Sequence, residues 1–346
     1  MLNTKQPVLR RFWYPVARAT DVTEDKPFGF TLLGQNIVLW RQADGGIACI
    51  EDRCPHRSAK LSLGFLQDGN VVCGYHGWTF EGSGKCVRIP QRENPTATGK
   101  MRIGGYQAAE RYGHIWVVLG EPLAELPHIP EADEPGLRHI DQFYESWKIG
   151  ALRLMENSFD NAHVAFTHRK TFGEASEPIP AKNEIEEFDY GFHLRAEIPV
   201  KIRGDLASKV LSATPGDTVR RVKNTWFMPF VRRLGITYPN GLRHTIITAA
   251  TPMTDDMTML VQWCYRSDTE EQAPAKDVNA FDRAVTLEDK VILESCDPDV
   301  PLDDRFEQHM PSDKPGLVMR RKLRELLATH GETEATRHTR PAQAAE

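Results

Sequence analysis

Two cysteines and two histidines stand at a spacing that can hold a metal. Each of two short segments supplies one thiolate and one imidazole, Cys54 and His56 as C-x-H and Cys73 and His76 as C-x-x-H. Such a set suits tetrahedral zinc, or a [2Fe-2S] cluster in which one iron takes both sulfurs and the other both imidazoles. Zinc sites more often carry two cysteines on one loop, so one of each type per loop favours the two-iron cluster. Structural zinc stays the alternative.

A second group of possible ligands lies in residues 157–168. Asp160 and His163 are three positions apart, so on a helix they face the same side. His168 follows five positions later, a rotation of about 140° on a helix. Both imidazoles therefore reach one metal only if the helix ends or bends between them. A single histidine on a helix is more often packed or capped than bound to metal, so the spacing alone leaves the question open.

A metal held by two histidines needs a further ligand, and an amphipathic helix predicted at about 278–295 carries the candidates. Glu288 falls near the centre of its apolar stripe and Asp289 at the edge, so both acids point partly inward. An unpaired buried carboxylate is costly, which makes this helix a candidate part of a site. Periodicity does not choose between these two acids. Asp282, earlier on the helix, is the weaker alternative.

The elements that must position these residues differ between the two halves of the chain. Short β-branched and aromatic segments separated by glycine-containing turns run from Phe12 to about Leu119 and predict a small antiparallel β domain. A proline-rich, acidic linker follows, and then helical and strand periodicities alternate. Helices are expected at about 152–165, 278–295 and 317–328. We place the first domain at residues 1–120, the linker at 121–140, the second domain at 141–329 and a disordered tail at 330–346.

Composition and charge narrow the class of protein. The 346 residues are 40% apolar and 26% charged, which is typical of a soluble globular chain with room for two domains. A net charge of −5 disfavours nucleic acid and anionic lipid as partners. No apolar run reaches the roughly 18 residues that span a membrane, and no secretory signal is recognisable, so a cytoplasmic location is expected. The remaining cysteines are predicted to be buried hydrophobes: Cys49, Cys86, Cys264 and Cys296.

The two loop motifs, CPHR and CGYHGW, resemble the iron-sulfur motif of Rieske proteins. The D-x-x-H-x-x-x-x-H segment downstream resembles the catalytic segment of Rieske non-heme iron oxygenases. The resemblance covers about residues 10–328 and is greatest to α subunits that act as monooxygenases or O-demethylases. It implies an α+β chain, with an N-terminal all-β Rieske [2Fe-2S] domain. The C-terminal domain would be a helix-grip catalytic domain with an antiparallel sheet and covering helices.

The resemblance also implies a role for each candidate residue. The positions that match cluster ligands are Cys54, His56, Cys73 and His76. The positions that match ligands of a mononuclear Fe(II), which leaves sites open for dioxygen, are His163, His168 and Asp289. Asp160 matches the carboxylate through which electrons cross to the iron from a cluster ligand, His76 of the partner subunit. Asn157 matches an amide close to the iron.

The implied function is a terminal oxygenase that hydroxylates or oxidatively demethylates a small aromatic or alicyclic substrate with O2. The chain has no dinucleotide fingerprint, so a separate NAD(P)H-dependent reductase or ferredoxin must supply electrons. A homotrimer is expected. A cis-dihydroxylating dioxygenase is one alternative, and a Rieske electron carrier or zinc-stabilised binding protein is an alternative of another class. Aromatic residues expected near the substrate are Phe166, Phe172, Phe227, Phe230 and Trp263.

Overall fold

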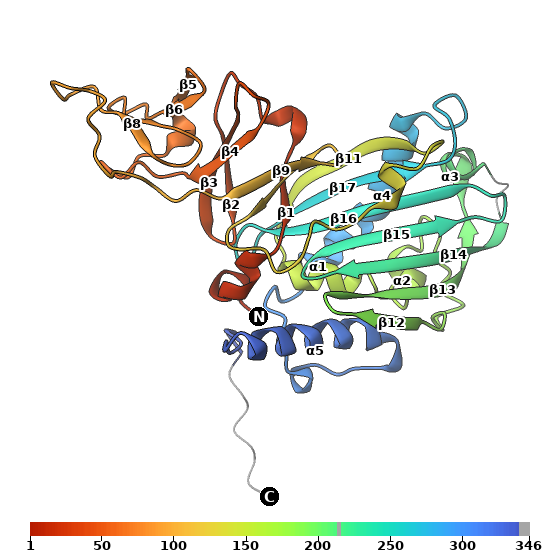
Figure 1. The fold of residues 1–346 in the computed structure, drawn as a ribbon. Helices are drawn as coiled ribbons and strands as arrows, with labels where there is room; N and C mark the ends of the chain where they lie inside the picture. The colour runs from red at the N-terminus through yellow and green to blue at the C-terminus, as the bar shows by residue number, and fades with distance from the viewer. Residues whose placement is uncertain (213–215, 339–346) are drawn as a thin grey trace, which may run out of the picture. The chain divides into compact units, whose positions relative to one another are not determined.

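The computed structural model describes residues 1–212 and 216–338, and the chain divides into two units (Figure 1). One unit is Arg10–Leu126, and the other combines Met1–Leu9 with Pro127–Glu346. The chain thus leaves the first unit inside the predicted linker. The first nine residues, which we assigned to the first domain, belong to the second unit instead. The Thr4 amide and hydroxyl, for example, both donate to the Asp255 carboxylate at 2.8 Å.

The first unit consists of three small antiparallel sheets. Their strand orders are β1-β10-β9, β2-β3-β4 and β5-β6-β7-β8. The strands are β1 (Tyr14–Arg18), β2 (Phe28–Leu32), β3 (Gln35–Arg41), β4 (Ile47–Glu51), β5 (Phe65–Gln67), β6 (Asn70–Val72), β7 (Thr79–Phe80), β8 (Cys86–Arg88), β9 (Gln107–Arg111) and β10 (His114–Val118). The predicted small β domain is therefore confirmed.

Turn chemistry and a buried apolar core explain why this segment folds as short strands. Asp68 and Gly69 form the two-residue connection between β5 and β6, with φ of 51° and 73°. Two positive φ values match the twist of a tight hairpin, and Asp and Gly tolerate them better than most residues. Trp40 and Phe80 lie fully buried between the sheets, in the same apolar cluster as the side chains of Cys54 and Cys73. The candidate ligand loops are thus anchored in the core of this unit.

The second unit is built on a seven-stranded antiparallel sheet in the order β11-β17-β16-β15-β14-β13-β12 (Figure 1). Its strands are β11 (Arg138–Trp147), β12 (Glu184–Phe188), β13 (Gly191–Ile202), β14 (Gly216–Phe227), β15 (Val231–Thr237), β16 (Arg243–Pro252) and β17 (Thr258–Arg266). Its helices are α1 (Ala151–Asn157), α2 (Val164–Thr167), α3 (Gly204–Leu211), α4 (Ala275–Leu293) and α5 (Lys314–Thr329). This arrangement confirms the predicted α+β class with helices covering an antiparallel sheet.

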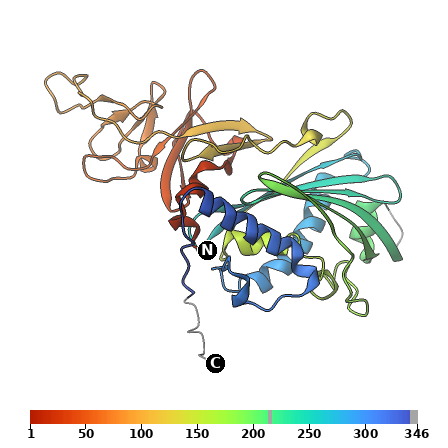
Figure 2. The same cartoon turned by 60° about the horizontal axis from the view of Figure 1, so that its bottom comes forward.

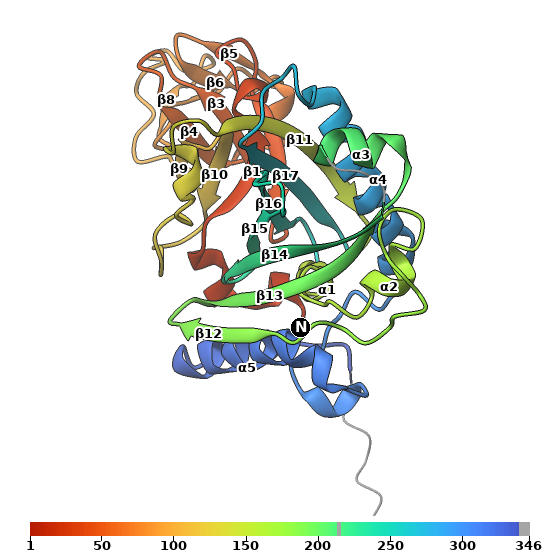
Figure 3. The same cartoon turned by 90° about the vertical axis from the view of Figure 1, so that its right-hand side faces the viewer.

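Helices α1, α2 and α4 lie on the same side of the sheet (Figure 3). Helix α1 packs against β16, and α4 packs against β11 and α2. The close approach of the chain before α1 to the segment after α4 requires Gly150, because a Cβ there would lie 2.0 Å from the Pro298 carbonyl oxygen. Helix α5 runs beside β12 (Figures 1 and 2), where the Arg321 guanidinium pairs with Glu187 at 2.6 Å.

Two sequence predictions about the second unit need correction. The helix expected at 152–165 is interrupted, because α1 ends at Asn157 and α2 begins at Val164. The disorder expected from residue 330 does not apply to 331–338, since several of these residues make hydrogen bonds with distant segments. The Ala335 carbonyl accepts from the Leu2 amide at 2.7 Å, and Arg337 pairs with Asp256 at 2.6 Å. The remainder of the predicted tail, 339–346, lies outside the described residues.

None of the described helices is both long enough and apolar enough to span a lipid bilayer.

Two candidate metal centres and a catalytic cavity

The first candidate centre lies on two loops of the first unit that share one backbone design. In each loop the cysteine carbonyl accepts a hydrogen bond from the amide four positions later, Ser58 to Cys54 at 2.9 Å and Gly77 to Cys73 at 2.9 Å. Both donor residues have a positive φ, 59° at Ser58 and 72° at Gly77. The two loops therefore have the same hydrogen-bonded turn, which fixes the backbone around each cysteine–histidine pair.

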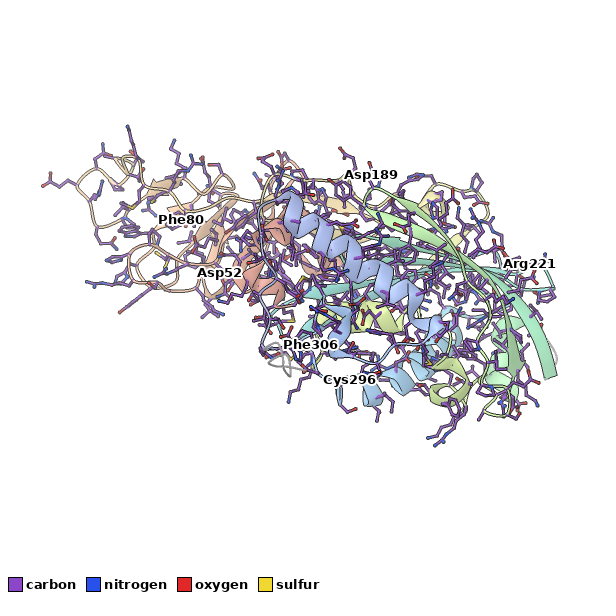
Figure 4. The ribbon with its side chains drawn as sticks, turned by 90° about the horizontal axis from the view of Figure 1, so that it is seen from below. Asp52, Phe80, Asp189, Arg221, Cys296 and Phe306 are labelled. Atoms are coloured by element: carbon purple, nitrogen blue, oxygen red, sulfur yellow. The ribbon has the colours of Figure 1, made fainter. Side chains whose placement is uncertain are left out.

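The first of these loops is held down by Asp52, which is buried where β4 ends. Its carboxylate accepts hydrogen bonds from the amide and hydroxyl of Ser62 at 2.7 and 2.6 Å. Asp52 and Phe80, both labelled in Figure 4, lie in this unit, and Phe80 belongs to the same buried cluster as Cys54 and Cys73. The Asp52 carboxylate thus links the two ends of the loop that carries the CPHR motif.

The four donor side chains of these loops lie together. The Cys54 and Cys73 side chains are buried and interact with each other, while the imidazoles of His56 and His76 stand 4.5 Å apart between ring centroids and are partly exposed. Burial raises the pKa of the Cys54 thiol to about 11, and Cys73 adds to the shift. The His56 Nδ1 atom is buried without a hydrogen-bond partner among the described residues. Two adjacent thiols and an orphaned imidazole nitrogen fit a cluster that holds sulfurs inside and imidazoles outside.

The second candidate centre forms where α1, α2 and α4 meet. His163 immediately precedes α2 and His168 immediately follows it. Their Nε2 atoms are 3.2 Å apart, and each lies 3.5 Å from Oδ1 of Asp289 on α4. The same Oδ1 atom is buried and has no hydrogen-bond partner among the described residues. Three donors of types that bind divalent transition metals therefore point at one spot.

A separate carboxylate faces the Nδ1 atom of each of these histidines. Oδ2 of Asp160 lies 3.4 Å from Nδ1 of His163, and Oε2 of Glu288 lies 3.0 Å from Nδ1 of His168. Asp160 is itself positioned by the Ala162 amide at 2.7 Å. Carboxylates at this place orient metal-binding imidazoles and leave Nε2 free to bind the metal. Helical periodicity left Glu288 and Asp289 open as candidates and the family resemblance favoured Asp289, and the geometry gives the two acids different positions.

The local environment keeps the His168 imidazole neutral. Burial, and then the positive charges of His163, Arg220 and Arg232, lowers the pKa of His168 to about 3. Burial raises the pKa of Asp289, whereas His163 and the Asn157 amide lower it. A neutral imidazole is the form that binds a metal. The predicted residue Asn157 thus lies beside the carboxylate that faces both histidines.

The third acid considered, Asp282, lies in a different cluster with His244 and Cys264. Its carboxylate accepts a hydrogen bond from the Gln142 amide and lies 3.3 Å from Nε2 of His244. A guanidinium nitrogen of Arg266 stands 3.3 Å from the other ring nitrogen of that histidine. A permanent positive charge at this distance disfavours a second metal, so we interpret the cluster as a buried polar network.

A cavity of about 140 Å³ adjoins the second centre. Its walls come from the inward faces of β13 to β17 and from α1 and α4. Of the five aromatic residues expected near the substrate, only Phe172 lines it. Phe166 is exposed, and Phe230 and Trp263 are buried but do not line the cavity. We missed the polar side chains on the strands, because residues 220–225 on β14 show no alternation of apolar and polar types that would mark the inward face.

Three of the four remaining cysteines are buried as predicted, namely Cys49, Cys86 and Cys264. Cys296 is not, because it lies after α4 with part of its surface exposed (Figure 4).

Comparisons with known proteins agree with this geometry. Residues 12–107 match the Rieske [2Fe-2S] domain, and residues 147–329 match the vanillate O-demethylase oxygenase C-terminal domain. Methylxanthine N1-demethylase NdmA of Pseudomonas putida is 30% identical over 343 residues, covering 96% of this chain and 93% of that protein. The vanillate O-demethylase oxygenase subunit of Pseudomonas sp. (strain HR199 / DSM 7063) is 37% identical over 186 residues, covering 50% of this chain and 49% of that protein.

Solved structures extend the likeness to the fold. The structure of NdmA from Pseudomonas putida CBB5 superimposes with a TM-score of 0.79 at 28% identity, covering 95% of this chain and 94% of that one. Dicamba monooxygenase bound to dicamba gives a TM-score of 0.79 at 23% identity, covering 94% and 99%. At that level of identity the second match supports the fold alone.

Proposed function

The chain belongs to the Rieske non-heme iron oxygenases and is an O2-dependent oxidoreductase, and from this premise we propose that it is the terminal oxygenase of a multicomponent system. It hydroxylates or oxidatively demethylates a small organic substrate, with electrons from a separate NAD(P)H-dependent reductase or ferredoxin. The observation that carries this proposal is the convergence of His163, His168 and Asp289 beside a cavity, in a chain that also has the two Cys/His loops.

We assign the cluster to the paired loops of the first unit. Cys54 and Cys73 would hold it on the buried side, and His56 and His76 would hold it on the partly exposed side. A cluster of this type supplies single electrons. The role of the chain is to place the imidazoles near solvent, where a redox partner can approach them.

We assign the mononuclear ion, Fe(II), to His163, His168 and Asp289. Two imidazoles and one carboxylate form the facial set that leaves coordination positions open, and iron held there supplies the reductive activation of dioxygen. Glu288, hydrogen-bonded to Nδ1 of His168, would fix the tautomer and direction of that imidazole. Asp160 stands 3.4 Å from Nδ1 of His163, where it would orient the second imidazole. Asn157 steadies the carboxylate of Asp289. The cavity walls hold the substrate beside the ligands and limit the entry of water.

We propose further that the chain works as a head-to-tail homotrimer. Beside His76, the first unit exposes large apolar side chains, with Leu63 79% and Tyr75 65% exposed. The second unit does so on α4, where Val291 is 74% and Ile292 53% exposed. Large apolar side chains gathered on a surface indicate contact with another protein, and each patch lies by one candidate centre. Covering each with the other in a second copy would bring His76 of the partner subunit towards Asp160.

Metal analysis of the purified chain tests the main proposal. Full loading would give about three irons per polypeptide, two in the cluster and one in the second unit. About two irons with no oxygen uptake would point to an electron carrier, and zinc with no visible absorption would point to a binding protein. Turnover with a reductase and identification of the product would separate demethylation or hydroxylation from cis-dihydroxylation. Sedimentation velocity of the holoprotein tests the trimer.

A further inference from the structure

Two arginines line the catalytic cavity, Arg220 on β14 and Arg232 on β15. The Arg220 guanidinium carbon lies 4.6 Å from the centre of the Phe172 ring, and that ring stacks on His168 at 4.9 Å. The Arg232 Nε atom donates to Asn224 Oδ1 at 3.0 Å. Both guanidinium groups therefore lie near the candidate iron ligands, on the sheet side of the cavity.

Neither guanidinium group forms an ion pair with a carboxylate of the described residues, which sets them apart from their neighbours on the same strands. Arg221 points out of the sheet and pairs with Glu197 at 3.0 Å. Arg233 also faces away from the cavity, and its Nε atom donates to Glu131 at 2.9 Å. In both consecutive pairs, the outward arginine has a carboxylate partner and the inward arginine does not.

The charge of the cavity lining does not compensate these two cations once iron is bound. The lining contains three carboxylates, Asp160, Asp282 and Asp289. Two of them face the candidate iron ligands or belong to them, and a ferrous ion brings two positive charges. The ferrous ion and the two arginines would therefore bring four positive charges against the three negative charges of the lining carboxylates. Burial, and then the charge of Arg220, already lowers the pKa of Arg232 to about 9.

Other polar groups in the cavity are already paired with each other. The Thr248 hydroxyl donates to Gln262 at 3.0 Å, and the Gln262 amide donates to Gln142 at 2.9 Å. The Gln142 amide donates in turn to Asp282. Each guanidinium group meets a neutral partner and keeps further N–H donors. The partner of Arg220 is Tyr238, and the partner of Arg232 is Asn224. A guanidinium binds a carboxylate through two parallel bonds better than it binds a neutral group.

We propose that the substrate is an organic carboxylate whose anionic group binds to Arg220 and Arg232. This inference rests on the proposed function, because it takes the cavity to be the place where substrate meets the iron. The carboxylate would neutralise the net charge of the loaded site. It would also fix the orientation of the substrate, with its oxidisable carbon directed to the His163, His168 and Asp289 side of the cavity.

Binding of matched acids and amides to the iron-loaded holoprotein tests the proposal without turnover. We would titrate benzoate against benzamide, phenylacetate against phenylacetamide, and cinnamate against cinnamamide, by calorimetry at pH 7.5. In at least one pair the acid should bind about tenfold more tightly than the amide. Arg220→Gln and Arg232→Gln should each weaken binding of that acid about tenfold and leave binding of the amide unchanged.

The control is Arg221→Gln, on the same strand as Arg220 but 79% exposed and directed into solvent (Figure 4). It should leave acid binding unchanged. If a glutamine variant is poorly folded, as judged by circular dichroism, the lysine variant at that position should fold and keep part of the preference. No acid preference in any pair overturns the proposal. So does a preference that survives both glutamine substitutions, since the acid would then be binding to the metal alone.

Metal content measured on the same samples separates this inference from the proposed function. Absence of any acid preference in the wild-type protein at full iron loading rejects the carboxylate substrate only. An acid preference that depends on both arginines, in protein that takes up no mononuclear iron, supports the anion site while rejecting the assigned oxygenase chemistry.

Discussion

The two candidate metal centres are built in different ways. All four proposed cluster ligands lie within residues 54–76, on two loops that repeat one hydrogen-bonded turn with a positive φ at the same position. The ligands of the second centre come from the flanks of α2 and from α4, and only the packing of α4 against β11 and α2 brings them together. The first geometry is set by local sequence, and the second depends on the tertiary structure of its unit.

Replacing a cluster ligand should have the largest effect and should affect one centre only. Cys73→Ser removes one of the two buried sulfurs, so we expect loss of the cluster and turnover below detection. The second unit should keep its iron, because its ligands take no part in the loop. Visible absorption and iron content, at about one iron per chain, check this result. Loss of all iron would show that the two centres depend on each other.

Replacing Asp289 should give the converse result. Asp289→Ala removes the carboxylate that faces both histidines, so we expect loss of the mononuclear iron, at least about hundredfold lower turnover and an unchanged cluster spectrum. Glu288→Gln is the matched control on the neighbouring position. It should retain the iron with about tenfold weaker affinity, because it changes only the orientation of His168. Full iron retention in Asp289→Ala would transfer the ligand role to Glu288 or Asp282.

The same contrast explains which features of the two centres could be predicted from the sequence. The spacing of Cys54, His56, Cys73 and His76 was enough to predict one centre, since two repeated turns within a short segment carry all four residues. The five-residue step from His163 to His168 required a bend, and the structure supplies it by ending α1 early and placing the short α2 between the histidines. Helical periodicity could not separate Glu288 from Asp289, because both face inward and their roles depend on which histidine atom each one meets.

The local sequence pattern could not predict which arginines face the cavity. Arg220 and Arg221 are chemically identical in sequence, and only the sheet decides which of them faces the cavity. The boundary of the first unit was missed for a similar reason. Met1–Leu9 is held to the second unit by contacts with residues more than two hundred positions away.

Asp160 allows a test of whether turnover depends on a residue that is a ligand of neither centre. Asp160→Ala should leave both cluster and iron bound, since His163 keeps its Nε2 atom and the other ligands are intact. We expect turnover to fall about 10- to 100-fold, because the imidazole loses its orienting carboxylate. Steady-state oxygen uptake measured beside the metal content checks this prediction. Unchanged turnover would remove Asp160 from the working site.

Acid should affect the second unit through a carboxylate that is not among the proposed metal ligands. Burial alone would raise the pKa of Glu307, but hydrogen bonds from Arg153 and Arg320 outweigh burial and lower it to about 2. Arg320 is buried and also binds Glu156 at the end of α1, next to Asn157. The pKa of Glu307 is depressed from its usual 4.5, so its contribution to stability is complete above about pH 4.5 and is lost as pH falls towards 2.

Glu307→Gln should therefore lower the free energy of unfolding of the second unit by about 2 kcal/mol at pH 6, since Arg320 loses a charged partner. The difference from the wild type should shrink between pH 4.5 and the lowest pH at which the unit stays folded. Denaturant unfolding followed by far-ultraviolet circular dichroism at several pH values measures this difference. The visible spectrum of the cluster, followed on the same samples, should respond to pH equally in both proteins, because its loops are closed by local hydrogen bonds. A difference that stayed constant down to pH 3 would exclude Glu307 as the titrating group.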